Sequence, residues 1–253
     1  MSSIVATLSE VFNSFQGEGV YVGERQTFVR FAGCNLTCQY CDTPNSQAIV
    51  SEYKIEKQPG SRQIEKKNNP VNCRQLIDLI SVYEKPKAVS HSVCLTGGEP
   101  LLQVDFLKQF LPLLKEEIKL PIYLETNGVL PDHLNEIIDQ VDIIACDIKL
   151  PSATGLSGYF EEHKKFLEIA QMQNVFVKIV FTADSHAKEI DEAVSVIAGV
   201  SPEIALVLQP VTPHGAIKHR PTLEQYFAFY NIAKRKLKSV RLIPQTHKAL
   251  GIA

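Results

Sequence analysis

Three cysteines near the N-terminus are spaced to bind one inorganic cluster. Cys34, Cys38 and Cys41 form a C-x3-C-x2-C motif, so their thiolates lie on one short segment. A structural zinc site needs four protein ligands, usually in two paired knuckles, and no second knuckle follows here. A cubic iron-sulfur cluster held by three thiolates leaves one iron open to a small molecule. The motif therefore favours a [4Fe-4S] cluster, with zinc or unliganded thiols as the alternatives.

The other three cysteines, Cys73, Cys94 and Cys146, stand alone among apolar residues. We expect each to be a small buried side chain with no role in the site. The N-terminus has no charged segment followed by a long apolar run, so the chain is expected in the cytoplasm, where cysteines are kept reduced. These features argue against a disulfide framework and favour metal or redox use of the cysteine motif.

A second group of residues suited to ligand binding is Thr96-Gly97-Gly98-Glu99-Pro100. Glycines let the backbone approach a ligand closely, and a carboxylate beside an ammonium group forms a charge-assisted hydrogen bond. In isolation the same residues could form an ordinary turn at the end of a strand.

Alternating strand and helix patterns predict how these motifs are positioned. Apolar runs predict strands at 27–31, 92–96, 121–125, 142–147, 175–181 and 204–209, with a weaker one at 240–243. Helical spacing of apolar residues predicts helices at 73–83, 103–117, 133–140, 159–173, 187–198 and 223–237. This order predicts an α/β fold, a partial (β/α) TIM-like barrel of about six parallel strands. Polar and glycine residues follow four or five of the strands, which predicts a site at the carboxyl rim.

Composition and charge indicate one domain that acts on a small molecule. A chain of 253 residues with 45% hydrophobic residues can form one sizeable core, so a single domain over residues 1–253 is expected. The net charge of -2 provides no basic excess for nucleic acid, and no apolar run is long enough to span a membrane. Residues 53–72 are polar, Lys-rich and interrupted by proline and glycine, which predicts an exposed insertion in the form of a solvated loop.

The cysteine motif directly after a strand, followed by Gly97-Gly98-Glu99-Pro100, resembles the radical SAM superfamily. In that superfamily the open iron binds the amino and carboxylate groups of S-adenosylmethionine (SAM). The resemblance implies that the second motif, including Gly98 and Glu99, meets the SAM amino group.

Further motifs resemble the 7-carboxy-7-deazaguanine synthase family. They are Ser14-Phe15-Gln16-Gly17-Glu18-Gly19, Phe28-Val29-Arg30, Cys41-Asp42-Thr43, Glu125-Thr126-Asn127-Gly128, Asp147-Ile148-Lys149-Leu150-Pro151-Ser152 and Pro244-Gln245-Thr246-His247-Lys248. The family converts 6-carboxy-5,6,7,8-tetrahydropterin to 7-carboxy-7-deazaguanine with loss of ammonia, in the queuosine and 7-deazapurine pathway. The resemblance implies SAM, a [4Fe-4S] cluster and Mg2+ as cofactors, an electron donor such as flavodoxin, and a homodimer.

The resemblance also assigns residues to binding roles. The implied substrate contacts are Phe15, Gln16, Gly17, Glu18, Arg30, Thr96 and the terminal residue Ala253, where the family has proline. The implied SAM contacts are Gly98, Glu99, Asp147, Ile148, Lys149, Gln209, Pro210, Val211 and Thr212. Asp147 stands where other members carry serine, and Thr43 matches the magnesium position. His247 and Glu125 are further candidates for the pocket wall. A primary amide such as that of Gln16 suits a pterin edge, and the planar fork of Arg30 suits the substrate carboxylate.

Two alternatives share the cysteine motif. A glycyl-radical activase would act on a partner protein and would not need the loop around Gln16. A non-catalytic iron-sulfur or zinc module would use Cys34, Cys38 and Cys41 only as structural ligands.

Overall fold

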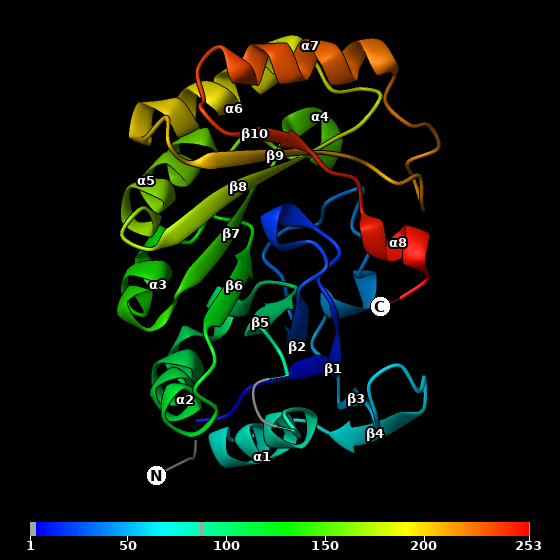
Figure 1. The fold of residues 1–253 in the computed structure, drawn as a ribbon, viewed down its shortest axis with the longest axis vertical. Helices are drawn as coiled ribbons and strands as arrows, with labels where there is room; N and C mark the ends of the chain where they lie inside the picture. Colours follow the sequence, from blue (N-terminus) through cyan, green and yellow to red (C-terminus); the bar gives the residue numbers. More distant parts are fainter. Residues whose placement is uncertain (1–3, 87–88, 253) are drawn as a thin grey trace.

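Seven neighbouring strands of one sheet run parallel and carry the rim on which the motifs lie. The computed structural model describes residues 4–86 and 89–252, whose ten-stranded sheet has the order β10-β9-β8-β7-β6-β5-β2-β1-β3-β4 (Figure 1). The parallel strands are β2 (Arg25–Phe31), β5 (Ser92–Gly97), β6 (Ile122–Thr126), β7 (Ile143–Ile148), β8 (Asn174–Phe181), β9 (Ala205–Pro210) and β10 (Val240–Leu242). The predicted α/β fold is confirmed, with the weak strand at 240–243 as its seventh parallel member.

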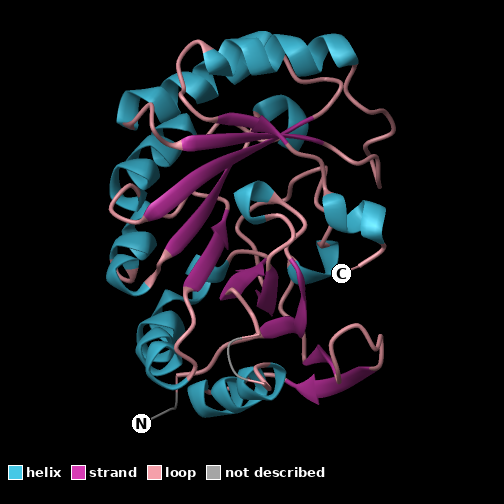
Figure 2. Ribbon diagram, in the orientation of Figure 1, coloured by secondary structure: helices cyan, strands magenta, loops and turns pink. Residues whose placement is uncertain are grey.

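Apart from the short α4 (Pro151–Thr154) and α8 (Thr246–Leu250), the helices cover the convex side of this sheet (Figure 2). They are α1 (Cys73–Tyr83), α2 (Val104–Glu117), α3 (Pro131–Asn135), α5 (Phe160–Ala170), α6 (Ala187–Val200) and α7 (Leu223–Lys234). The predicted helix at 133–140 is instead α3 followed by a 3-10 turn at Ile138–Gln140, because the backbone of Ile137 leaves the helical region at φ -129° and ψ 3°. None of the described helices combines the length and apolar character needed to cross a lipid bilayer.

Three strands that were not predicted extend the sheet beyond β2. β1 (Leu8–Phe15) pairs antiparallel with β2, and β3 (Glu52–Glu56) pairs parallel with β1 and antiparallel with β4 (Ile64–Asn68). Polar residues interrupt β1, so its sequence shows neither a continuous apolar run nor a regular alternation.

The interpretation of 53–72 as a solvated loop is wrong for β3. Tyr53 and Ile55 are each 5% exposed, whereas every residue of β4 is exposed. The Tyr83 hydroxyl donates to the carbonyl oxygen of Val11 at 3.2 Å and also to that of Glu56. The strand period of two buries alternate residues of β3 although its neighbours in sequence are polar.

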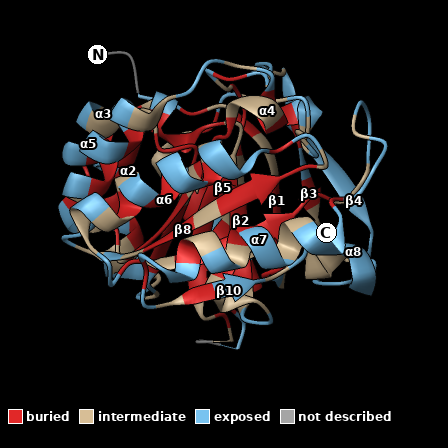
Figure 3. Cartoon of the chain, turned by 90° about the horizontal axis from the view of Figure 1, so that it is seen from above, coloured by how far each residue is buried: buried red, intermediate tan, exposed pale blue. Residues whose placement is uncertain are grey.

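The core has two parts, one on each side of the curved sheet. The larger part lies between the sheet and the helices and contains Phe106, Phe110 and Phe166, so the strands are buried and the outer helix faces exposed (Figure 3). The smaller part lies inside the barrel and consists of Phe12, Phe28, Cys94, Tyr123, Ile143, Ala145, Phe176 and Val207. Cys94 and Cys146 are buried as expected, but Cys73 is only half-buried, because it lies in the first turn of α1.

Candidate active site

The predicted rim forms one cavity of about 210 Å³. Its wall combines the loop after β1, the cysteine loop and the carboxyl ends of the parallel strands. The predicted site residues that line it are Phe15, Gln16, Gly17, Glu18, Arg30, Cys34, Cys38, Cys41, Thr43, Thr96, Gly98, Glu125, Asp147, Lys149, Gln209, Val211, Thr212 and His247. Residues separated by more than 230 positions in the sequence therefore meet at one surface.

The polar floor of the cavity follows from the strand period of two. On six successive parallel strands, an apolar residue of the inner core is followed two positions later by a polar one. The pairs are Phe28 and Arg30, Cys94 and Thr96, Tyr123 and Glu125, Ala145 and Asp147, Phe176 and Lys178, and Val207 and Gln209. Because residues two apart on a strand share a face, the inner core places a ring of polar side chains directly above itself.

The cysteine loop offers three thiols to the cavity. Cys34, Cys38 and Cys41 are free and half-buried, and all three line the wall. Burial raises the pKa of the Cys34 and Cys38 thiols, so a metal would have to displace protons on binding. The three donors on one loop, with no second knuckle, fit a [4Fe-4S] cluster better than a closed zinc site.

The turn that follows β5 packs tightly against the start of the cysteine loop, and this contact depends on Gly98. Its amide donates to Phe31 O at 3.1 Å, and the next amide, of Glu99, donates to Gly33 O at 2.8 Å. A Cβ atom at Gly98 would lie 2.5 Å from Ser46 O and closer still to Gly33 O. Only glycine lets the two backbones approach this closely.

The side chain of Glu99 does not reach the cavity wall. It is fully buried, and its carboxylate accepts hydrogen bonds from Leu101 N at 3.0 Å, Thr126 Oγ1 at 2.9 Å and Asn127 N at 2.8 Å. Burial raises the pKa of Glu99, and these three bonds oppose that effect. In the described structure, the carboxylate thus fixes the turn through these three bonds.

Asn127 extends this network to the cysteine loop and to α5. Its Nδ2 donates to Asn35 Oδ1 at 2.8 Å, and its carbonyl oxygen lies 3.0 Å from Nε2 of the fully buried His163. A carbonyl oxygen only accepts, so Nε2 must carry the ring proton and Nδ1 is left as a buried atom without a partner. Burial lowers the pKa of His163 to about 4, which keeps the ring neutral.

Charges of alternating sign cross the cavity floor. Glu18 pairs with Lys178, whose Nζ lies 3.7 Å from Asp147 Oδ2, and Lys149 Nζ donates to the same oxygen at 2.7 Å and to Tyr40 OH at 3.0 Å. Burial alone would raise the pKa of Glu18, but Lys178 and a hydrogen bond from Gln245 lower it to about 2. Glu18 is therefore ionised at neutral pH.

Two buried oxygen atoms in the cavity wall have no partner among the described residues. They are Oδ1 of Asp147 and Oε1 of Gln209. Buried polar groups are normally hydrogen-bonded, and an unpaired one indicates a missing ligand or water. Both residues belong to the segments matched to SAM binding, so the cavity retains acceptors for a polar ligand.

Hydrogen bonds and a ring contact with neighbouring side chains hold the residues that match the family's substrate-binding positions. Gln16 Nε2 donates to Gln26 Oε1 and to Glu125 Oε1, both at 2.9 Å, and its Oε1 accepts from the Glu18 amide at 3.0 Å, so both ends of the side-chain amide are held in place. Glu125 also accepts from Thr96 Oγ1 at 2.7 Å. Arg30 lies over the Phe12 ring, 5.6 Å from its centroid.

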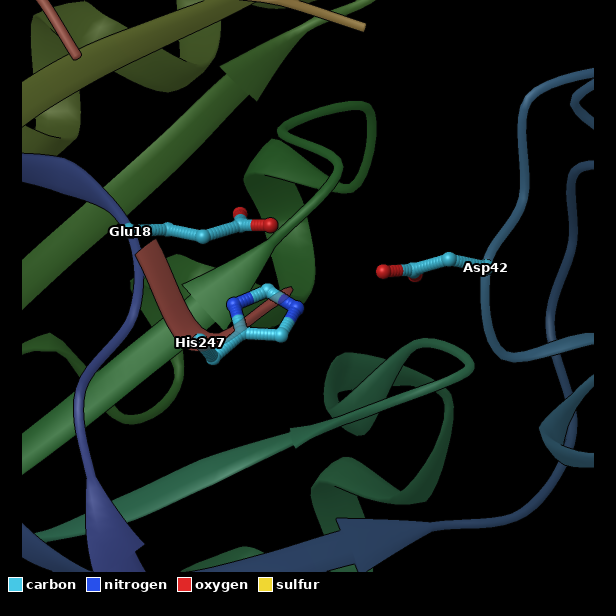
Figure 4. A group of neighbouring side chains, drawn as sticks. All are labelled: Glu18, Asp42 and His247. Atoms are coloured by element: carbon cyan, nitrogen blue, oxygen red, sulfur yellow. The ribbon is translucent and has the colours of Figure 1, made fainter. Parts of the chain in front are cut away.

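Glu18, Asp42 and His247 lie near Thr43 and could be taken for a metal site, since their ligand atoms all lie within 4.8 Å of one another (Figure 4). Figure 4 shows the two carboxylates facing each other, with the imidazole beside them. However, Gln245 Nε2 donates to Glu18 Oε1 at 2.8 Å and to Asp42 Oδ2 at 3.0 Å, so an amide nitrogen bridges the two carboxylates. We therefore do not assign a metal to this group.

A few predicted residues lie elsewhere, and others were missed. Ile148 and Pro210 are buried outside the cavity wall, and Ala253 lies outside the described residues. Lys178 and His163 were not predicted. Lys178 is the one charged residue of β8, whose sequence is NVFVKIVF, and that isolated charge was the available signal.

Replacing Gly98 by alanine should displace the cysteine loop. We expect G98A to destabilise the protein by about 1–3 kcal/mol, as for other overpacked sites, and to lower its iron content. Urea unfolding and iron per chain after anaerobic reconstitution measure both effects. Gly199, in α6, is the matched control because a Cβ there meets no atom within 4 Å. Wild-type iron content and stability in G98A would contradict the close approach.

His163 should make stability depend on pH. Its folded pKa is below its unfolded value, so its contribution is complete above about pH 6.5 and is lost as the pH falls toward 4. Between about pH 7 and pH 5.5 the free energy of unfolding should fall by about 1 kcal/mol from this group. H163Q, which keeps a donor for Asn127 O, should lack this part of the decrease in urea titrations at both pH values. An equal decrease in H163Q would show that His163 is not the group responsible.

The chain matches the Radical SAM superfamily over residues 28–198, more than half of its length. The solved structure of QueE from Escherichia coli superposes with a TM-score of 0.62 at 18% identity and covers 94% of both chains. Streptococcus suis SuiB bound to the precursor peptide SuiA gives a TM-score of 0.56 at 16% identity, over 86% of this chain and 48% of that one. At these identities the two structures show a shared fold.

Relatives with similar sequences identify the family within this superfamily. The 7-carboxy-7-deazaguanine synthase of Geobacter sulfurreducens is 45% identical over 255 aligned positions, which cover 99% of each chain. The synthases of Archaeoglobus fulgidus and Methanocaldococcus jannaschii are 35% and 33% identical, over 98% and 97% of this chain and 99% of each of theirs. The full-length similarity, together with the superfamily match, shows that the chain belongs to the 7-carboxy-7-deazaguanine synthase family of radical SAM enzymes.

Proposed function

We propose that the protein converts 6-carboxy-5,6,7,8-tetrahydropterin to 7-carboxy-7-deazaguanine with release of ammonia. The observation that carries the proposal is the single cavity in which three free thiols face a ring of polar side chains, two of whose buried oxygens have no partner. The full-length relatives bear the name of this activity. They do not favour an activase or a non-catalytic module.

The proposal assigns the cofactors to the cysteine side of the cavity. Cys34, Cys38 and Cys41 would hold the cluster, and the segment around Asp147 and Lys149 would bind SAM. When bound, the cluster and SAM supply a radical that removes a hydrogen atom from the substrate. Asp147 Oδ1 and Gln209 Oε1 would accept hydrogen bonds from the polar groups of SAM.

The opposite side of the cavity would bind the pterin. Arg30 uses Nε for Glu10 at 2.6 Å, and its two terminal amino groups make no hydrogen bond within residues 4–86 and 89–252. They would bind the substrate carboxylate, while ionised Glu18 would accept hydrogen bonds from pterin N–H groups. Thr43 would provide one oxygen to Mg2+, which takes its other ligands from water and substrate.

The proposal has further parts that follow from the family. The pathway would be queuosine and 7-deazapurine synthesis in the cytoplasm, with a one-electron donor such as flavodoxin. The enzyme would act as a homodimer, and each chain would form a single domain with the segment 53–72 as an insertion. Ala253 would be a further substrate contact.

An anaerobic assay tests the activity. The reconstituted protein is mixed with reductant, SAM, Mg2+ and 6-carboxytetrahydropterin, and 5'-deoxyadenosine and the deazapurine are measured by mass. We expect both products, and less deazapurine when Mg2+ is removed by a chelator. Formation of 5'-deoxyadenosine alone would reject the substrate. Neither product from protein with a full cluster would reject the proposed function.

Replacing Arg30 tests the substrate contact. R30A removes a charge-assisted bond to the carboxylate, so we expect KM for the pterin to rise about 10–100-fold while iron content is kept. R30K should be intermediate, because its ammonium lacks the planar fork. Arg74, an exposed arginine paired with Asp78 and Glu117 on the outer surface, supplies the control R74A. An unchanged KM in R30A would show that Arg30 does not bind the substrate carboxylate.

A further inference from the structure

Lys178 connects two carboxylates from distant parts of the chain. It lies on β8 directly opposite Asp147 of β7 in the strand register, and its side chain is 15% exposed. Its ammonium group pairs with Glu18, which follows β1, and lies 3.7 Å from Asp147 Oδ2. Glu18 belongs to the loop matched to the pterin, and Asp147 belongs to the segment matched to SAM.

The neighbouring groups make this cation difficult to replace. Lys178 faces Glu18, Asp147 and, from β6, Glu125, while Lys149 is the other cation at Asp147. Without Lys178, Glu18 and Glu125 would lose the ammonium group that they face, and Asp147 would keep only Lys149. Buried charges that lose their partners are strongly unfavourable, so the remaining side chains would have to move or take up protons.

We propose that Lys178 is a positioning residue that couples the two sites, so that pterin binding tightens SAM binding and the reverse. The inference rests on the proposed function for the identity of the two ligands. Asp147 has one oxygen engaged by the lysines and one without a partner, and Glu18 is held by Lys178 and Gln245. A ligand that binds at either carboxylate changes the electrostatic field at the ammonium group of Lys178. Because the other carboxylate interacts with the same ammonium group, its position and its electrostatic energy change as well.

The coupling is measured as the ratio of two SAM dissociation constants, obtained without and with saturating 6-carboxytetrahydropterin on the reconstituted enzyme in the absence of reductant. We expect a ratio of at least about fivefold in the wild type. K178M should reduce the ratio to near one, and K178R, which keeps the charge, should restore most of it. Because the ratio compares one variant with itself, a general loss of stability does not imitate this result.

Two controls keep the test decisive. K108M removes an exposed lysine paired with Glu136 at 2.6 Å and should keep the wild-type ratio. If K178M does not retain its cluster, K178Q supplies a neutral side chain with hydrogen-bond donors and should show the same loss.

The outcomes separate the two proposals. A wild-type ratio of one, or an unchanged ratio in K178M or K178Q, would overturn the coupling even if the wild type produces the deazapurine. If the wild type neither binds nor converts the pterin, the proposed function fails, and the coupling inference fails with it.

Discussion

Side chains on a strand alternate between its two faces, and this constraint builds the candidate site. The inner face of the barrel carries an apolar layer, with Tyr123 and Phe176 among its members, and the next inward position on each strand is polar. The apolar layer closes the barrel below, so the polar layer above it forms a floor rather than a channel. The positions of Arg30, Glu125 and Lys178 all follow from this single repeat.

The cysteine loop depends on a second close approach, between backbone and backbone. Gly98 allows the end of β5 to contact Gly33 and Ser46, and buried Glu99 ties that turn to Asn127. The cost of burying a carboxylate is offset by its three hydrogen bonds, two of them from backbone amides. A glutamate that resembles a ligand contact in the sequence is thereby used to hold the loop that carries the thiols.

Four charged groups of the cavity floor balance one another. Glu18 and Asp147 are paired with Lys178 and Lys149, so these four largely buried groups carry no net charge together. A charged ligand must then be received by groups that are not consumed by internal pairing, such as the terminal amino groups of Arg30 and the free oxygen of Asp147. One end of the cavity therefore offers the hydrogen-bond donors of Arg30, and the other end offers the acceptor oxygen of Asp147.

The sequence alone determined the parallel α/β fold and most of the residues that meet at the rim, because buried parallel strands read as apolar runs and motifs such as Cys34 to Cys41 are local. It did not show β1 or the pairing of β3, whose polar sequences become strands only when β2 and the core cover one face. It also did not show that Glu99 is hydrogen-bonded within its own turn and to Asn127, and it omitted Lys178 and His163. Their partners, Asn127, Glu18 and Asp147, lie far away in the chain, and hydrogen bonds and ion pairs of that kind exist only after folding brings the segments together. Tertiary structure therefore decided which polar residues support the site and which remain open to a ligand.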